Sequence, residues 1–195
     1  MPATFGDLFS DAAPDRIERL FLGLMLPPEA AAAASAVLEA ARGEEGLKGS
    51  PIRQDRLHIT LIHVGDYHGT LPGRVVADLL TAAGGLSESA FEVAFDRAGS
   101  FGGAPGKHPF VLLGREGVEA LAAFRDRLFK ALLRAGVRPL SREAFTPHVT
   151  LAYGDRRLPE RGIDPVRWRA TEFVLIHSEV GRSTYHTLGR WPLAD

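Results

Sequence analysis

The sequence predicts an α+β fold built mainly from antiparallel β-sheet. Several of the expected strands follow one another directly along the chain, with helices interspersed between the others, which is typical of α+β layers. A helix, a loop and a strand that begins with His-x-Thr-Leu occur in this order twice. The length of 195 residues and the 45% of hydrophobic residues suffice for one domain, or for one domain made of two similar lobes.

The first half of the chain is expected to contain a tail, two strands and two helices. Residues 1–16 combine Gly, Ser, Asp and Pro with few periodic apolar positions, so we expect a flexible tail before a single domain that spans residues 17–195. Pro27 and Pro28 end the first strand, and Pro28 begins an Ala-rich helix. In order, the expected elements are a strand over 20–26, a helix over 29–42, a strand over 57–64 and a helix over 73–83.

The second half is expected to contain one helix among five strands. Phe91, Val93 and Phe95 alternate as they would on a half-buried strand. The helix has apolar residues at helical spacing and ends before Gly136. The expected elements are strands over 91–98 and 110–113 joined by a Gly- and Pro-rich loop over 101–108, a helix over 118–135, and strands over 147–152, 171–180 and 185–188.

Two short motifs, His58–Leu61 (His-Ile-Thr-Leu) and His148–Leu151 (His-Val-Thr-Leu), each fall on an expected strand. Side chains alternate between the two faces of a strand, so the His and the Thr of each motif share one face and the apolar residues share the other. Two such strands that face each other would form a symmetric pocket. It would hold two imidazoles and two hydroxyl groups.

These groups suit the cleavage of a phosphodiester bond. A neutral His removes a proton from the attacking hydroxyl or water, and a protonated His donates a proton to the leaving oxygen. Thr60 and Thr150 would hydrogen-bond the non-bridging phosphate oxygens. The chemistry requires no metal, no cofactor and no covalent intermediate. One motif alone would more often contain an ordinary half-buried strand histidine, but the pair favours His58 and His148 as catalytic residues.

The spacing of His58, His63 and His68 at intervals of five residues raises the question of a metal site. Positions an odd number of residues apart lie on opposite faces of a strand, so we expect His63 to point away from His58. Metal ligands must converge in space. We therefore expect no metal.

Composition excludes several classes of function. The formal net charge is -1, from 23 basic and 24 acidic side chains, which argues against a protein that coats long nucleic acids. The absence of cysteine excludes disulfides, thiolate metal sites and a Cys nucleophile. No segment has the apolar length of a membrane span. We expect a cytoplasmic protein, because the lack of cysteine suits a reducing compartment, and we expect a monomer.

Beyond the two motifs, the sequence resembles the 2H phosphoesterase superfamily, which is defined by two His-x-[Ser/Thr]-x motifs. It is similar above all to the bacterial RNA 2′,3′-cyclic phosphodiesterases, historically called 2′-5′ RNA ligases. Asp55–Leu61 resembles the D-x-L-H-x-T-L stretch of that family, and Phe145–Leu151 resembles its F-x-P-H-x-T-L stretch. The likeness spans about residues 17–193, including the first strand over 19–27 and the closing strands over 171–193.

The resemblance implies a bilobal fold with two pseudo-symmetric lobes, each of which contributes one motif to a central cleft. It also implies metal-independent hydrolysis of RNA 2′,3′-cyclic phosphate ends to 2′-phosphomonoesters. By position, His58 would donate a proton to the leaving 3′-oxygen and His148 would activate water, while Thr60 and Thr150 would hold the phosphate. The near symmetry of the site leaves the reverse assignment open. The partner would be an RNA end or a small nucleotide that carries a 2′,3′-cyclic phosphate.

The sequence departs from the family just after each motif. Many members have a basic residue after the second motif, where this chain has Tyr153, either a base-stacking residue or an ordinary aromatic at a strand end. After the first motif, an aromatic of the family is replaced by Ile62 and His63. Arg182 and Lys107, both in expected loops, are our candidates for further phosphate contacts.

Two other functions are compatible with the same residues. A related 2H enzyme would act on 2′-5′-linked oligonucleotides or on a small cyclic nucleotide, and weak ligation of RNA ends is the reverse reaction. A non-catalytic module would bind nucleotides or RNA ends in the same cleft. The presence of all four motif residues favours an enzyme over a binding module.

Overall fold

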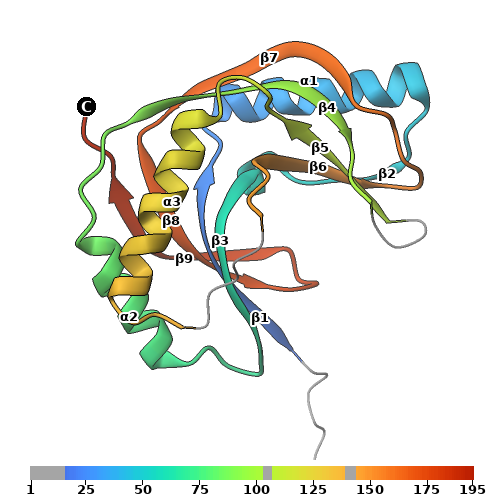
Figure 1. Cartoon of the computed structure of the whole chain (residues 1–195). Coiled ribbons are helices and arrows are strands. Elements are labelled where there is room, and N and C mark those ends of the chain that lie inside the picture. The colour runs from blue at the N-terminus through green and yellow to red at the C-terminus, as the bar shows by residue number, and fades with distance from the viewer. Residues whose placement is uncertain (1–15, 103–106, 139–143) are drawn as a thin grey trace, which may run out of the picture.

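The computed structural model describes residues 16–102, 107–138 and 144–195. This part of the chain contains three α-helices and nine strands, and the strands form two antiparallel sheets (Figure 1). The α+β class with mainly antiparallel sheet, predicted from the sequence, is confirmed. Of the expected tail, residues 1–15 lie outside the described residues, and Arg16 forms ion pairs with Glu18 and Glu179. None of the described helices has both the length and the apolar composition of a membrane span.

The two sheets each contain one motif strand. The first sheet has the order β3-β1-β8-β9, and the second has the order β2-β6-β5-β4-β7. The strands of the first sheet are β1 (Ile17–Met25), β3 (His58–His68), β8 (Glu172–Glu179) and β9 (Thr184–Pro192). The strands of the second are β2 (Gly49–Pro51), β4 (Phe91–Ser100), β5 (His108–Leu113), β6 (His148–Gly154) and β7 (Arg161–Ala170).

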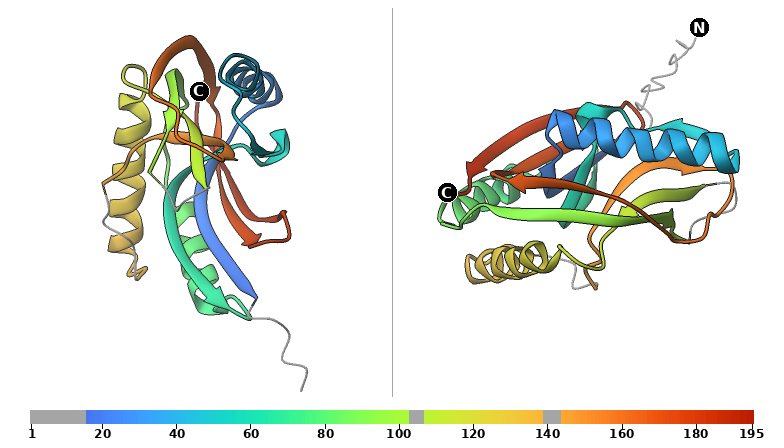
Figure 2. Two further views of the ribbon diagram at one scale, coloured as in Figure 1. Left: turned by 90° about the vertical axis from the view of Figure 1, so that its right-hand side faces the viewer. Right: turned by 90° about the horizontal axis from the view of Figure 1, so that it is seen from above.

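The helices connect the two sheets in a crossed arrangement. Helix α1 (Pro28–Glu45) precedes β3 of the first sheet but packs against β6 and β7 of the second. Helix α3 (Glu119–Arg134) precedes β6 of the second sheet and packs against α2 (Gly73–Gly84), against β4 of that sheet and also against β3 of the first. Its Phe124 contacts Phe173 of β8 in the first sheet. Figure 2 shows α1 and α3 on opposite sides of the molecule.

Most expected elements lie where the sequence places them, but three short or charged segments were missed. These are β2, the 3-10 turn Gln54–Arg56 and the whole of β7. In β7, Val166, Trp168 and Ala170 are buried and alternate with exposed arginines. This pattern is present in the sequence, but Pro165 argues against a strand there. The proline is tolerated because β7 is an edge strand.

Strand β3 contains a β-bulge within its motif. Thr60 lies opposite Gly23 of β1, and Ile62 lies opposite the adjacent Leu22, so Leu61 has no partner. An extra residue of this kind shifts the alternation of side chains by one position. Leu61 and Ile62 are accordingly both buried, although they are neighbours in the chain.

Strand β6 contains the same irregularity at the corresponding position. Thr150 and Ala152 lie opposite adjacent residues of β5, so Leu151 has no partner. The order of buried, half-buried and exposed positions is identical over the first seven residues of β3 and the whole of β6. The two motifs therefore share a local backbone geometry as well as a sequence.

Replacement of Gly23 by Ala should disturb the β1–β3 pairing at the bulge. A Cβ at this position would lie 2.7 Å from the backbone oxygen of Ile59, which is closer than such contacts allow. We expect Gly23→Ala to lower the free energy of unfolding by about 1–3 kcal/mol, measured by urea denaturation.

Gly43→Ala is the matched control, because a Cβ at this position of α1 meets nothing within 4 Å. Removing a helical glycine without a clash should raise stability by roughly 0.5–1 kcal/mol. The two substitutions should thus have opposite signs. A Gly23→Ala protein as stable as the Gly43→Ala protein would contradict the close approach of β1 and β3.

Candidate active site

The two motif histidines are held in the same way by the backbone. The Nδ1 atom of His58 lies 2.8 Å from the carbonyl oxygen of Arg56, and Nδ1 of His148 lies 2.8 Å from the carbonyl oxygen of Thr146. A carbonyl oxygen only accepts, so in each ring Nδ1 carries the hydrogen and donates it. The Nε2 atom of each neutral ring is then left as the atom that exchanges protons with a substrate.

Aromatic rings fix the orientation of both imidazoles. The ring of Phe21 stacks on His58 with 4.8 Å between ring centroids, and Tyr185 meets His58 edge-on at 5.7 Å. On the other motif, Phe101 meets His148 edge-on at 5.0 Å. Each histidine is therefore restrained by a hydrogen bond along one edge and by at least one ring contact.

The motif threonines lie on the same face as the histidines, as expected. Thr60 and Thr150 are half-buried, whereas Ile59 and Val149, which separate each His from its Thr, are fully buried. The prediction that each motif presents one imidazole and one hydroxyl on a shared face is consistent with this burial. The apolar face of each motif belongs to the main hydrophobic core.

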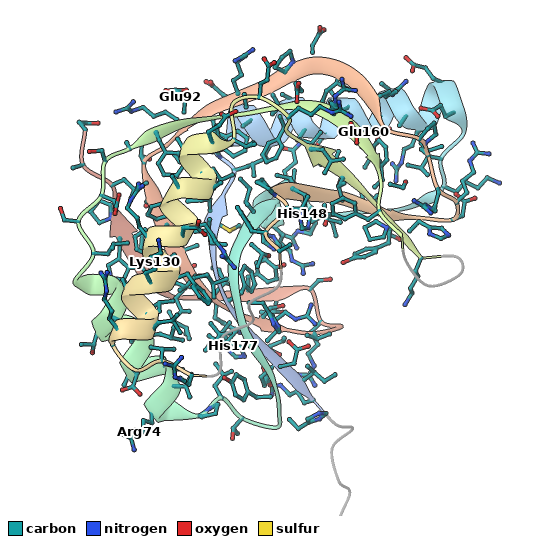
Figure 3. The ribbon with its side chains drawn as sticks, viewed as in Figure 1. Arg74, Glu92, Lys130, His148, Glu160 and His177 are labelled. Atoms are coloured by element: carbon teal, nitrogen blue, oxygen red, sulfur yellow. The ribbon has the colours of Figure 1, made fainter. Side chains whose placement is uncertain are left out.

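The two motifs meet where the sheets approach each other. Strands β3 and β6 are in contact, and Figure 3 shows His148 near the middle of the molecule, beside the start of β3. A cavity of about 370 Å³ is lined by Thr60 of the first motif and His148 of the second. His58 is close enough to His148 for the charge of one to affect the other.

The pKa of His58 is lowered from 6.5 to about 4. Burial is the largest cause, because it disfavours the charged ring. The hydrogen bond to the Arg56 carbonyl opposes this effect, and the positive charges of His148, Arg56 and Arg19 add to it. In the free protein, His58 is therefore neutral at neutral pH.

The expectation that His63 points away from His58 is wrong. The bulge at Leu61 reverses the alternation, so His63 returns to the face of the motif residues. His63 lies opposite Phe21, the residue that stacks on His58. It also lines the same cavity as Thr60 and His148.

His63 is held by a chain of charged contacts that the sequence did not suggest. Its Nε2 atom lies 2.9 Å from a carboxylate oxygen of Asp66. Both oxygens of Asp66 accept hydrogen bonds from Arg19, at 2.7 and 2.6 Å. The Arg19 hydrogen bond holds the pKa of Asp66 well below its ordinary value. Arg19 and Asp66 lie on different strands, so no local pattern points to this network.

Two positions that follow the motifs correspond to each other. Tyr153 occupies in β6 the position that His63 occupies in β3, and 51% of its surface is exposed. Arg125 of α3 also lines the cavity beside His148, with its guanidinium 4.9 Å above the ring of Phe129. Nothing in the sequence selects Arg125, because the apolar residues around it in the helix predict only a face packed against the core.

The other basic candidates lie elsewhere. Arg182 is in the exposed turn between β8 and β9, 3.5 Å from Glu179, and does not line the cavity that holds Thr60 and His148. Lys107 is exposed just before β5. Their roles, like that of Tyr153, stay predictions. Across the described residues, no three His, Asp or Glu side chains gather as metal ligands would.

Comparisons with known proteins agree with this geometry. The chain matches the 2′-5′ RNA ligase superfamily over residues 27–182. E. coli LigT in its apo form is a similar solved structure, with 25% identity and a TM-score of 0.71, covering 92% of this chain and 99% of that one. The protein TT0787 of Thermus thermophilus shares 27% identity with a TM-score of 0.67, covering 90% and 97% of the two chains.

No curated protein sequence matches the chain. The family match nevertheless extends over most of the sequence and includes both motifs. The structural matches extend over nearly the whole length of each relative. The chain belongs to the 2′-5′ RNA ligase superfamily.

Proposed function

We propose that the protein hydrolyses RNA 2′,3′-cyclic phosphate ends to 2′-phosphomonoesters by acid–base catalysis between His58 and His148. The observation that carries the proposal is the matched pair of imidazoles. Each donates Nδ1–H to a backbone carbonyl, and each is left with Nε2 for proton exchange. Two such groups in one cleft supply a donor and an acceptor without a metal.

The reaction is a displacement at phosphorus. One neutral imidazole takes a proton from water, whose oxygen forms a bond to phosphorus. The bond from phosphorus to the 3′-oxygen breaks, and the other imidazole, in its protonated form, gives its proton to that oxygen. Thr60 and Thr150 donate hydrogen bonds to the non-bridging oxygens, which carry the developing negative charge.

A nucleotide substrate is supported by a relative. E. coli LigT, 26% identical to this chain with a TM-score of 0.70 over 92% of it and 99% of that chain, has been crystallised with 3′-AMP. This ligand is a nucleoside with a phosphate on its ribose. In the present chain, the exposed ring of Tyr153 would stack on a base at the rim of the cleft. Arg182, which lies 3.5 Å from Glu179, would contact a phosphate of the substrate.

Replacement of either motif histidine should abolish most of the activity. We expect His58→Ala and His148→Ala each to lower kcat for a 2′,3′-cyclic nucleotide by roughly 100- to 10,000-fold, because each loses one proton-transfer group. Product identification by chromatography should show a 2′-phosphate, and activity should survive EDTA. His186→Ala, a half-exposed histidine of β9 bound to Glu179, is the control and should keep its activity. Near-normal turnover in either motif variant would refute the two-histidine mechanism.

The low pKa of His58 has a consequence for its role. If His58 is the proton donor, as the resemblance implies, it must take up a proton when the substrate binds, because it is neutral beforehand. A phosphate anion beside the ring favours the imidazolium form and raises its pKa. The protein should therefore take up a proton when the substrate binds at neutral pH.

Two measurements test this coupling. A histidine NMR titration should find a pKa of about 4 for His58 in the free protein, and a higher value with inorganic phosphate bound, the signal being assigned with His58→Ala. Calorimetry of phosphate binding in buffers of different ionisation enthalpy should show proton uptake. If the pKa does not move and no proton is taken up, His58 stays neutral and is the acceptor instead.

A further inference from the structure

A second, larger cavity lies beside His58. It has a volume of about 730 Å³ and is lined by residues of β1, the 3-10 turn, β7, β8 and β9. Met25, Arg56 and Tyr185 form the wall nearest to the motif. Met25 lies opposite His58 in the sheet, the Arg56 carbonyl accepts its Nδ1–H, and the Tyr185 ring touches its imidazole. This groove is therefore an extension of the catalytic cleft.

The groove carries an excess of positive charge. Four arginines line it against two carboxylates. Arg53 is bound to Asp55, and Arg190 is bound to Glu172. The remaining arginines are Arg169, which is 3.8 Å from Glu92 and 4.0 Å from Asp195, and Arg56.

Arg56 differs from the other arginines of the groove, because no carboxylate of the described residues balances its charge. Its guanidinium lies 4.4 Å above the ring of Tyr185, which fixes its position. Its Nε atom is buried and has no hydrogen-bond partner, and no carboxylate pairs with it within the described residues. The charge of this guanidinium is thus uncompensated within the described residues, and an anionic ligand in the groove would pair with it.

The other side chains of the groove suit a polynucleotide more than a peptide or a lipid. Ser183, Thr184 and Thr187 also line the groove, and each carries a hydroxyl group. Hydroxyl and guanidinium groups are the usual contacts of a sugar–phosphate chain. The groove also begins beside His58, which in the proposed reaction transfers a proton at the terminal phosphate.

We infer that this groove binds the RNA strand on the 5′ side of the terminal nucleotide, with Arg56 contacting the first phosphodiester of that strand. The inference rests on the proposed function and adds to it a preference for oligonucleotides over mononucleotides. A cyclic mononucleotide would fill the cleft between the motifs and leave the groove empty.

The test compares two substrates in one protein. Wild type should act on a tetraribonucleotide with a 2′,3′-cyclic phosphate end with a kcat/KM about tenfold higher than on a 2′,3′-cyclic mononucleotide. Arg56→Met should lower this ratio to near one, mainly by raising KM for the tetranucleotide. The ratio within one protein cancels any effect of Arg56 on the pKa of His58, because both substrates use that histidine.

Two controls distinguish a direct contact between Arg56 and the RNA phosphodiester from a general effect of positive charge in the groove. Arg53→Met makes the same change of charge in the same groove, but at a residue already bound to Asp55, and should keep the ratio. A tetranucleotide whose last internal linkage is an uncharged methylphosphonate should lose the advantage with wild type and show no further loss with Arg56→Met.

Binding measurements test the role of the groove independently of catalytic turnover. Anisotropy of a fluorescent tetraribonucleotide ending in a 2′-phosphate should show weaker binding by Arg56→Met, for every base sequence, with a salt slope reduced by about 0.7. Equal ratios for the two substrates in wild type, or equal losses in Arg53→Met and Arg56→Met, would overturn the inference. Absence of turnover with both substrates would instead overturn the proposed function, while Arg56-dependent binding would still support the groove.

Discussion

At Leu61 and at Leu151, each motif strand contains one residue that its neighbouring strand does not match. These two bulges decide which side chains face the cleft. With strict alternation, His63 and Tyr153 would point into the core, and each motif would present only a His and a Thr. The bulge brings a third side chain, His63 in β3 and Tyr153 in β6, to the face of the motif residues. Gly23 makes the first bulge possible, because β1 passes too close to Ile59 for any Cβ.

Side-chain orientations that depend on one strand alone can be predicted from the sequence. Those that depend on how two strands pair cannot. The faces of His58 and Thr60 follow from alternation over three residues, and the structure agrees with them. The position of His63 depends on how β3 pairs with β1, which no periodicity of β3 alone encodes. Strand β7 was missed for a different reason: its alternation is visible, but Pro165 argues against a strand unless the segment is known to be an edge.

The net charge of -1 hides a local concentration of positive charge. Many surface arginines are neutralised by a neighbouring carboxylate, as Arg53 is by Asp55. Arg56 instead lies against the ring of Tyr185 beside the first motif, and no carboxylate of the described residues pairs with it, whereas Arg125 contacts an aromatic ring but is also paired with Asp126. A ring orients a guanidinium without cancelling its charge. The charge of Arg56 reaches the chemistry, since it is among the causes that lower the pKa of His58.

The crossed helices explain how two half-sites can stay in register. Helix α1, which precedes β3, packs on the second sheet, and helix α3, which precedes β6, packs on β3 of the first sheet as well as on β4 of its own. Separating the sheets would therefore expose apolar surface on both sides. Leu38 of α1 and Phe124 of α3 belong to the same continuous core as Ile59 and Val149, which underlie the two motifs. The distance between the imidazoles is thus set by the packing of the core rather than by a flexible connection. A donor and an acceptor that act on opposite sides of one phosphorus atom require such a fixed separation.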